Sequence, residues 1–196
     1  MKVCHLLSGG IDSSILLYWL VSKDYEVKPL FINYGQVAAP GEFRCAKYHC
    51  KKNGLKLEEV DIPKISKLTL NKLTSPNSSE NLFYPNRNML LLSIAGIYAY
   101  EDRCDVISIG LVKAGVFPDA TREFIEQSTN LLCTSLGKQI AVISPFLSLD
   151  KKEAVYIGKQ LNVSIFNTYS CVANPLTACS VCDKCKERSD VLKVFT

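Results

Sequence analysis

A loop with two consecutive glycines near the N-terminus constrains the fold more than any other part of this chain. Ser8–Ser14 reads Ser-Gly-Gly-Ile-Asp-Ser-Ser; it follows the mostly apolar segment Lys2–Leu7 and opens into Ile11–Ser22, whose apolar residues recur at helical spacing. This order predicts a strand, a tight turn and a helix. Glycines let a ligand approach the backbone, and the unpaired amides and the dipole of a helix start favour an anion. A phosphate group is therefore the expected ligand.

The side chains of this loop add to the predicted phosphate site. Its serine hydroxyls can donate to phosphate oxygens, whereas the Asp12 carboxylate would repel bare phosphate unless it holds Mg²⁺ or accepts a backbone amide. The loop lacks the Gly-Lys-Ser/Thr of a Walker A motif and the Gly-x-Gly-x-x-Gly of a dinucleotide fold, which excludes those two classes. A turn that merely caps a helix is the alternative. The predicted phosphate and Mg²⁺ contacts are Ser8, Gly9, Gly10, Asp12, Ser13 and Ser14.

The rest of the chain alternates strand and helix patterns. Further strands are predicted at Val27–Asn33, Lys56–Asp61, Asp105–Gly110 and Gln139–Ile143, and helices at Glu42–Asn53, Asn88–Tyr100, Thr121–Leu136 and Asp150–Asn162. This alternation predicts an α/β, Rossmann-like parallel sheet of five strands with helices on both faces. The polar stretch Ile65–Asn81 is expected to be a loop or a mobile cover, and the regular pattern fades after Asn167.

Four of the nine cysteines gather in the C-terminal tail, at Cys171, Cys179, Cys182 and Cys185. The chain shows no secretory signal, so a metal explains this cluster better than disulfides do. Four thiolates match a tetrahedral Zn²⁺ with no open position, which predicts a structural zinc site. A redox Cys-x-x-Cys pair and an iron–sulfur cluster are the alternatives. We therefore divide the chain into a nucleotide-binding domain, residues 1–166, and a zinc-binding segment, residues 167–196, ordered by the metal.

Charge and hydropathy exclude several partners. Lys and Arg exceed Asp and Glu by 23 to 19, a net charge of +4 without a basic cluster, so nothing indicates nucleic-acid binding. The longest apolar run, Ile15–Val21, is too short to span a bilayer, and no signal peptide is evident. We expect a cytoplasmic protein. His5 and His49 have no nucleophile nearby in the sequence and are expected to be structural.

Further motifs lie between the loop and the tail, and two of them place a cation at a helix start. Arg87 precedes the apolar helix, and Lys151 follows the expected helix cap Asp150. Cations at these positions are unfavourable unless an anion is bound, although a solvated surface is the alternative. The other motifs are Tyr34-Gly35-Gln36 and Phe117–Ile125. Taken in this order with Ser-Gly-Gly-x-Asp-Ser and the four cysteines, the motifs closely resemble the 7-cyano-7-deazaguanine synthase (QueC) family of the PP-loop ATP pyrophosphatase superfamily, over nearly the whole chain.

The resemblance implies an activity. In that family a 7-carboxy-7-deazaguanine acid is adenylated by ATP, ammonia displaces AMP to give the amide, and a second ATP drives dehydration to the nitrile. It further implies ATP, Mg²⁺ and Zn²⁺ as cofactors and a homodimer. Carried onto this chain, it implies catalytic roles for Asp12, Arg87 and Lys151, and cofactor binding by Asn33, Tyr34 and Gly35 in addition to the loop residues.

Two segments depart from the family pattern. Val37–Pro40 stands where the family usually has Arg-His, and Leu111–Phe117 is shorter than its counterpart and lacks an Asp and a Ser-Gly-Tyr turn. The motifs expected to bind ATP are thus intact, whereas the segments expected to recognise the acceptor are altered. Two further hypotheses follow: a QueC-like ligase that transfers the activated acid to an amine on a protein or DNA, as in a defence system, and a non-catalytic module that only binds nucleotide and zinc.

Overall fold

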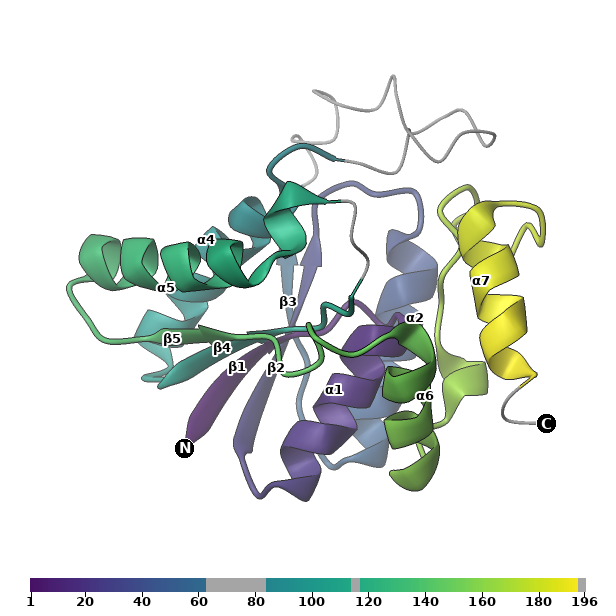
Figure 1. The fold of residues 1–196 in the computed structure, drawn as a ribbon, viewed down its shortest axis with the longest axis horizontal. Helices are drawn as coiled ribbons and strands as arrows, with labels where there is room; N and C mark the ends of the chain where they lie inside the picture. Colours follow the sequence, from purple (N-terminus) through teal and green to yellow (C-terminus); the bar gives the residue numbers. More distant parts are fainter. Residues whose placement is uncertain (63–83, 114–116, 194–196) are drawn as a thin grey trace.

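The computed structural model describes residues 1–62, 84–113 and 117–193, and its centre is a parallel sheet of five strands in the order β3-β2-β1-β4-β5 (Figure 1). The strands are β1 (Lys2–Leu6), β2 (Glu26–Asn33), β3 (Glu58–Asp61), β4 (Val106–Ile109) and β5 (Ala141–Ile143). The chain leaves β1 toward β2 on one side and reaches β4 on the other, so the strand order reverses at β1. Ligands of such sheets bind at this point, outside the carboxyl ends of the strands.

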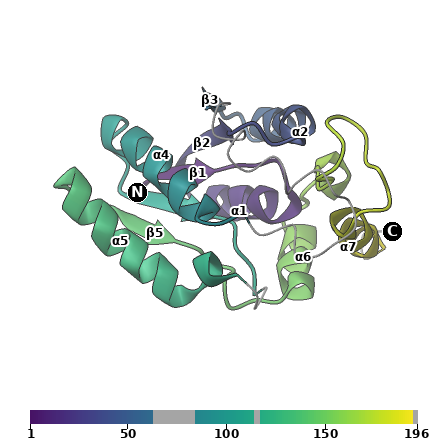
Figure 2. The same ribbon diagram turned by 90° about the horizontal axis from the view of Figure 1, so that it is seen from above.

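Helices cover both faces of the sheet, as Figure 2 shows from above. One face carries α1 (Ile11–Ser22), α2 (Ala39–Lys52) and α6 (Lys151–Gln160); the other carries α4 (Arg87–Glu101) and α5 (Arg122–Leu136). Successive side chains of β1 point to opposite faces of the sheet and enter the two cores in turn. Val3 packs with α1, and Cys4 packs with α4. The predicted α/β fold class is confirmed.

Two helices differ from the prediction. α2 begins at Ala39 rather than Glu42, because Pro40 occupies the first turn, where its missing N–H costs no hydrogen bond. The tail contains an unpredicted helix, α7 (Asp183–Leu192), which is largely polar and is anchored by buried Cys185 and Val191. It lies beside α6 at the right of Figure 1. The predicted loop at residues 65–81 and part of the altered segment, residues 114–116, lie outside the described residues.

Glycines allow three segments to meet at the carboxyl end of β1. A Cβ at Gly9 would collide with the Glu42 carbonyl oxygen of α2 and come within 2.8 Å of the Ala46 nitrogen. A Cβ at Gly110, just after β4, would lie 2.8 Å from the Ser13 nitrogen of α1. Close backbone packing thus joins the loop, α2 and the end of β4. Among the described helices, none combines the length and apolarity needed to cross a bilayer.

Candidate nucleotide-binding site and metal centre

The loop after β1 presents free backbone donors. Gly9 turns the chain at φ +73°, and Gly10 is extended (φ −75°, ψ 169°) where α1 begins. The backbone N–H groups of Ile11, Asp12 and Ser13 have no acceptor in the part of the chain that the structure describes. Unsatisfied amides at a helix N-terminus, together with the helix dipole, form an anion-binding site.

Two cavities open at the carboxyl ends of β1, β2 and β4. The inner cavity has a volume of about 190 Å³, and the loop cavity has a volume of about 250 Å³. Their shared wall consists of Ser8, Ser13, Glu42, Arg87 and Gly110. The inner cavity has an apolar lining of Leu6, Leu30, Ile32, Leu91, Ile109 and Leu111. The loop cavity is lined by charged and tail residues that include Asp12, Lys151, Tyr169, Lys184, Glu187 and Arg188. An apolar compartment beside a charged one suits a ligand with an aromatic base and a phosphate chain.

The three loop serines do not behave alike. Ser8 and Ser13 line both cavities, with their hydroxyl oxygens 2.9 Å apart. Ser14 is fully buried, and its hydroxyl has no hydrogen-bond partner among the described residues. It lies on the face of α1 that carries Ile11 and Ile15 into the core. The structure therefore brings Ser8 and Ser13 together and separates Ser14 from the cavities.

Asp12 and Lys151 meet across 139 residues of sequence. Lys151 Nζ donates to both carboxylate oxygens of Asp12 at 2.7 Å and lies 3.4 Å from Glu187 of α7. A capping box at Asp150 starts α6 and fixes the backbone that carries Lys151. The pair is three-quarters buried, with side-chain exposures of 24% and 25%. Asp12 thus pairs with a lysine of α6, a contact that the sequence analysis did not assign to it.

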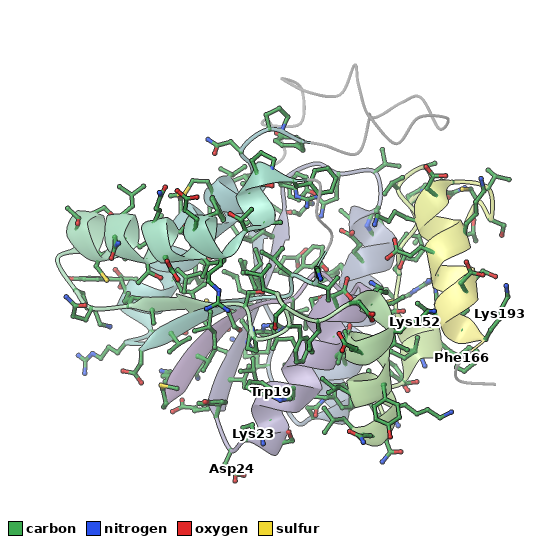
Figure 3. All side chains as sticks on the ribbon, viewed as in Figure 1. Trp19, Lys23, Asp24, Lys152, Phe166 and Lys193 are labelled. Carbon is green, nitrogen blue, oxygen red and sulfur yellow. The ribbon has the colours of Figure 1, made fainter. Side chains whose placement is uncertain are left out.

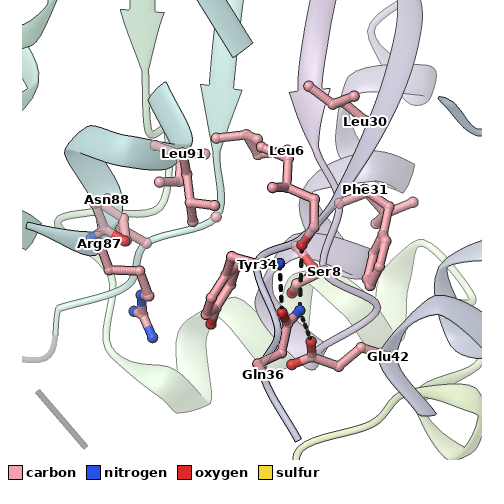
Figure 4. Close-up of a pocket in the computed structure, with 16 residues that line it drawn as sticks. Leu6, Ser8, Leu30, Phe31, Tyr34, Gln36, Glu42, Arg87, Asn88 and Leu91 are labelled. Atoms are coloured by element: carbon pink, nitrogen blue, oxygen red, sulfur yellow. Dashed lines mark hydrogen bonds between the residues drawn. The ribbon is translucent and has the colours of Figure 1, made fainter. Parts of the chain in front are cut away.

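Arg87 starts α4 and lies on the shared wall of both cavities. Asp119, from the 3-10 turn Pro118–Ala120, accepts the backbone N–H of Asn88 at 3.2 Å and so satisfies a donor at this helix start. The Arg87 guanidinium is left to face the cavity, where Figure 4 shows it on the opposite side from Glu42.

The turn after β2 organises one side of the inner cavity. Asn33 Oδ1 accepts the Gly35 N–H at 3.0 Å, and its Nδ2 donates to Asp61 at 2.7 Å. Both polar atoms of the Asn33 side chain therefore stabilise the turn and the adjacent strand end. Gln36 Oε1 accepts the Tyr34 N–H at 3.0 Å. Of the predicted trio, Tyr34 lines the inner cavity, and Asn33 and Gly35 shape the turn that presents it. Burial raises the pKa of Tyr34 to about 12, so its hydroxyl stays protonated at neutral pH.

The four tail cysteines converge. Their sulfur atoms lie within 4.8 Å of one another, and the Sγ atoms of Cys179 and Cys185 are 3.9 Å apart. Zn–S bonds of about 2.3 Å in a tetrahedron give sulfur separations of about 3.8 Å, so this donor set fits one ion. Backbone N–H groups of Val181 and Cys182 lower the pKa of Cys179 to about 6, whereas burial raises the pKa of Cys185 to about 12. Burial thus opposes ionisation of the Cys185 thiol unless a cation lies beside it.

Residues at the N-terminal end of α2 pack against these four cysteines, which form the candidate metal centre. Ala38 and Cys45 are buried against Tyr169 and the tail cysteines. A Cβ at Gly41 would come within 2.9 Å of the Tyr169 ring. The segment Val37–Pro40, which departs from the family pattern, thus contributes buried surface to the tail contact.

Several residues that line the cavities were missed by the sequence analysis. Glu42 stood out only as a helix start, and Glu187 and Arg188 lie in a tail without periodic pattern. Arg188 Nη2 donates to the Phe166 carbonyl at 3.0 Å, while its Nη1 is buried with no partner among the described residues.

His5, by contrast, is structural in the way that the sequence predicted. It is fully buried, with Nε2 2.9 Å from the Ser13 carbonyl oxygen and Nδ1 2.8 Å from the Ser108 hydroxyl. Because the carbonyl only accepts, Nε2 carries the proton and the hydroxyl donates to Nδ1. Burial lowers the pKa of His5 to about 4, so the ring is neutral and ties the first turn of α1 to β4.

Comparisons with known proteins agree with this geometry. The model of the family described as queuosine biosynthesis protein QueC matches residues 2–196. The 7-cyano-7-deazaguanine synthase 1 of Desulfitobacterium hafniense (strain Y51) is 35% identical over 206 residues, covering 98% of this chain and 92% of that protein. The 7-cyano-7-deazaguanine synthase of Methanobrevibacter smithii is 30% identical over 213 residues, covering 98% and 93%.

Solved structures share the fold at lower identity. The U34-tRNA thiolase NcsA from Methanococcus maripaludis, solved with its [4Fe-4S] cluster, is 20% identical with a TM-score of 0.61, covering 100% of this chain and 66% of that one. A 4-thiouridine synthetase in complex with RNA and bound ATP is 21% identical with a TM-score of 0.53, covering 98% and 51%. Both support the predicted Rossmann-like architecture.

Proposed function

Since the chain belongs to the family of queuosine biosynthesis protein QueC, we propose that it is an ATP-dependent ligase that adenylates a 7-carboxy-7-deazaguanine-type acid and converts it with ammonia to the amide and then the nitrile. The observation that carries this proposal is the convergence of the free α1 amides, Asp12, Lys151 and Arg87 on two adjoining cavities at the strand-order reversal. The apolar inner cavity would take the nucleobase, and the loop cavity the phosphates and the acid.

Adenylation requires no enzyme nucleophile, because the carboxylate of the acid attacks the α-phosphorus of ATP and pyrophosphate leaves. The protein has to align the two reactants and stabilise charge that develops on the phosphates. The amides of Ile11 and Ser13 would donate to phosphate oxygens, and Arg87 would face the same charge from the opposite wall. Lys151 would turn from Asp12 to a phosphate when Asp12 holds Mg²⁺, which neutralises phosphate charge when bound.

The four cysteines of the candidate metal centre would hold Zn²⁺ with all four positions filled and no role in the chemistry. Four sulfur atoms that all lie within 4.8 Å of one another favour a single ion over a cluster whose thiolates bind separate irons. We propose residues 1–166 as the ATP-binding domain and residues 167–196 as the metal-ordered segment. We further expect a homodimer that acts in the cytoplasm.

Product analysis tests the proposal. Purified protein supplied with 7-carboxy-7-deazaguanine, ATP, Mg²⁺ and ammonia should release AMP and pyrophosphate and form the nitrile. Asp12→Asn should abolish AMP release, whereas Asp24→Asn, at an exposed turn labelled in Figure 3, should leave it unchanged. Binding of ATP without any AMP release by the wild type would refute an enzymatic function. AMP release without amide or nitrile would refute ammonia as the acceptor.

A further inference from the structure

One carboxylate faces both cavities without a part in the adenylation step. Glu42, in the first turn of α2, lines the inner and the loop cavity. Its Oε2 accepts a hydrogen bond from Gln36 Nε2 at 2.9 Å, which fixes the side chain (Figure 4). In the described ranges no Lys or Arg nitrogen lies within ion-pair distance of it.

A charged carboxylate is unfavourable at this place. Burial raises the pKa of Glu42 to about 7, although the hydrogen bond from Gln36 and the charge of Arg87 both favour the ionised form. The carboxylate also shares a wall with the site proposed for phosphates, which it would repel. An ionised carboxylate can only accept hydrogen bonds. Glu42 is therefore suited to the shared wall of the two cavities if it receives a cation or a proton during the reaction.

We propose that Glu42 binds the ammonium ion that supplies the nitrogen and accepts one of its protons. This inference rests on the proposed function, because ammonia is its second substrate. Ammonium has four N–H donors and no lone pair, so it can bind a carboxylate but cannot attack a carbonyl. The hydroxyl oxygens of Ser8 and Ser13, on the same shared wall, provide further acceptors.

The step balances as follows. Ammonium transfers a proton to the Glu42 carboxylate and becomes ammonia. The nitrogen lone pair forms a C–N bond with the acyl carbon of the adenylate, and the C–O bond to AMP breaks, with its electron pair leaving on the AMP phosphate. The new amide nitrogen loses its extra proton to solvent, and protonated Glu42 later does the same. Proton uptake also removes the negative charge of Glu42 while the phosphate departs.

Comparing ammonium with hydroxylamine as the nitrogen source distinguishes a proton-accepting role of Glu42 from a structural role. Hydroxylamine is largely unprotonated at neutral pH, so its attack on the adenylate needs no proton acceptor. Glu42→Gln keeps the shape of the side chain and the hydrogen bond to Gln36. We expect this variant to lose ammonium-dependent amide formation by roughly 10²-fold or more, the usual contribution of a general base. We expect acid-dependent ATP–pyrophosphate exchange and hydroxamate formation to stay within about threefold of wild type, as in the exposed control Glu126→Gln.

Raising the pH provides a second measurement, because it supplies free ammonia and should relieve the defect of Glu42→Gln. Glu42→Asp should retain part of the ammonium-dependent rate and serves if the first variant fails to fold. Equal losses with ammonium and hydroxylamine, or no loss with either, would overturn the role of Glu42. Absence of ATP–pyrophosphate exchange in the wild type would instead overturn the proposed function.

Discussion

Gly9 offers a direct test of how the phosphate loop is built, because Gly54 is a matched control. Both residues adopt a left-handed conformation, with φ +73° at Gly9 and +66° at Gly54. A Cβ at Gly54 would meet nothing within 4 Å, whereas a Cβ at Gly9 would collide with the Glu42 carbonyl oxygen and approach the Ala46 nitrogen. The two alanine variants thus share the backbone penalty and differ in the contact with α2.

The expected magnitudes follow from this comparison. The left-handed conformation costs an alanine roughly 1–2 kcal/mol, partly offset by the lower entropy of its unfolded chain, so Gly54→Ala should lose about 1 kcal/mol of unfolding free energy. Gly9→Ala should lose roughly 1–3 kcal/mol more, because backbone atoms of α2 must move, as in an overpacked core. The Gly9 carbonyl also accepts the Tyr169 N–H at 2.9 Å, so the tail moves with the loop.

Urea unfolding at a fixed saturating zinc concentration measures these differences, and equilibrium binding of ATP measures their effect on the site. Gly9→Ala should bind ATP far more weakly than wild type, and Gly54→Ala should bind it equally well. Equal stability of the two variants, within about 0.5 kcal/mol, would refute the close packing of the loop against α2.

Three other predictions follow from the same structure. Lys151→Met should lower kcat/KM for ATP roughly 10²-fold, since a positioned charge on the phosphates is lost, whereas Lys152→Met, at the exposed neighbour labelled in Figure 3, should change it less than twofold. Cys182→Ser should lower zinc content and the melting temperature, as chelation does, and Cys133→Ser should change neither; retained zinc in Cys182→Ser would contradict the metal centre. Because burial lowers the pKa of His5 to about 4, the unfolded chain takes up a proton at this residue first as the pH falls. His5 should therefore contribute a loss of about 3 kcal/mol in unfolding free energy between pH 6.5 and pH 4, and His5→Gln should lack this contribution in urea titrations.

The sequence predicted best the elements that are determined by residues adjacent in the chain. The loop and α1 follow from two glycines and a helical pattern, and the five strands follow from short apolar runs between helices. The burial of Ser14 could also have been predicted from the sequence. Helical spacing from Ile11 and Ile15 places Ser14 on the core face of α1, so its hydroxyl could have been separated from those of Ser8 and Ser13.

Contacts between distant segments could not be predicted from spacing. Lys151 and Asp12 were each identified as site residues, yet their pairing depends on how α6 packs beside α1 on the same face of the sheet. α7 was missed for a different reason. A polar helix has no apolar stripe to reveal it, and here two buried residues and the convergence of the cysteines hold it in place.

The metal centre and the loop cavity are linked through α7. Cys182 caps this helix and Cys185 lies in its first turn, so a metal bound by the cysteines fixes the helix start. Glu187 follows within the next turn, where it contacts Lys151 at 3.4 Å and holds Lys184 at 2.7 Å. A tetrahedral ion held by all four cysteines would offer no position to substrate, yet it would determine where these charges lie. Loss of the metal should therefore weaken phosphate binding through Lys151 before it unfolds the sheet. Among the described residues the tail adds no strand to the sheet, and it enters the cores only through Val191 and Leu192, at the far end of α7.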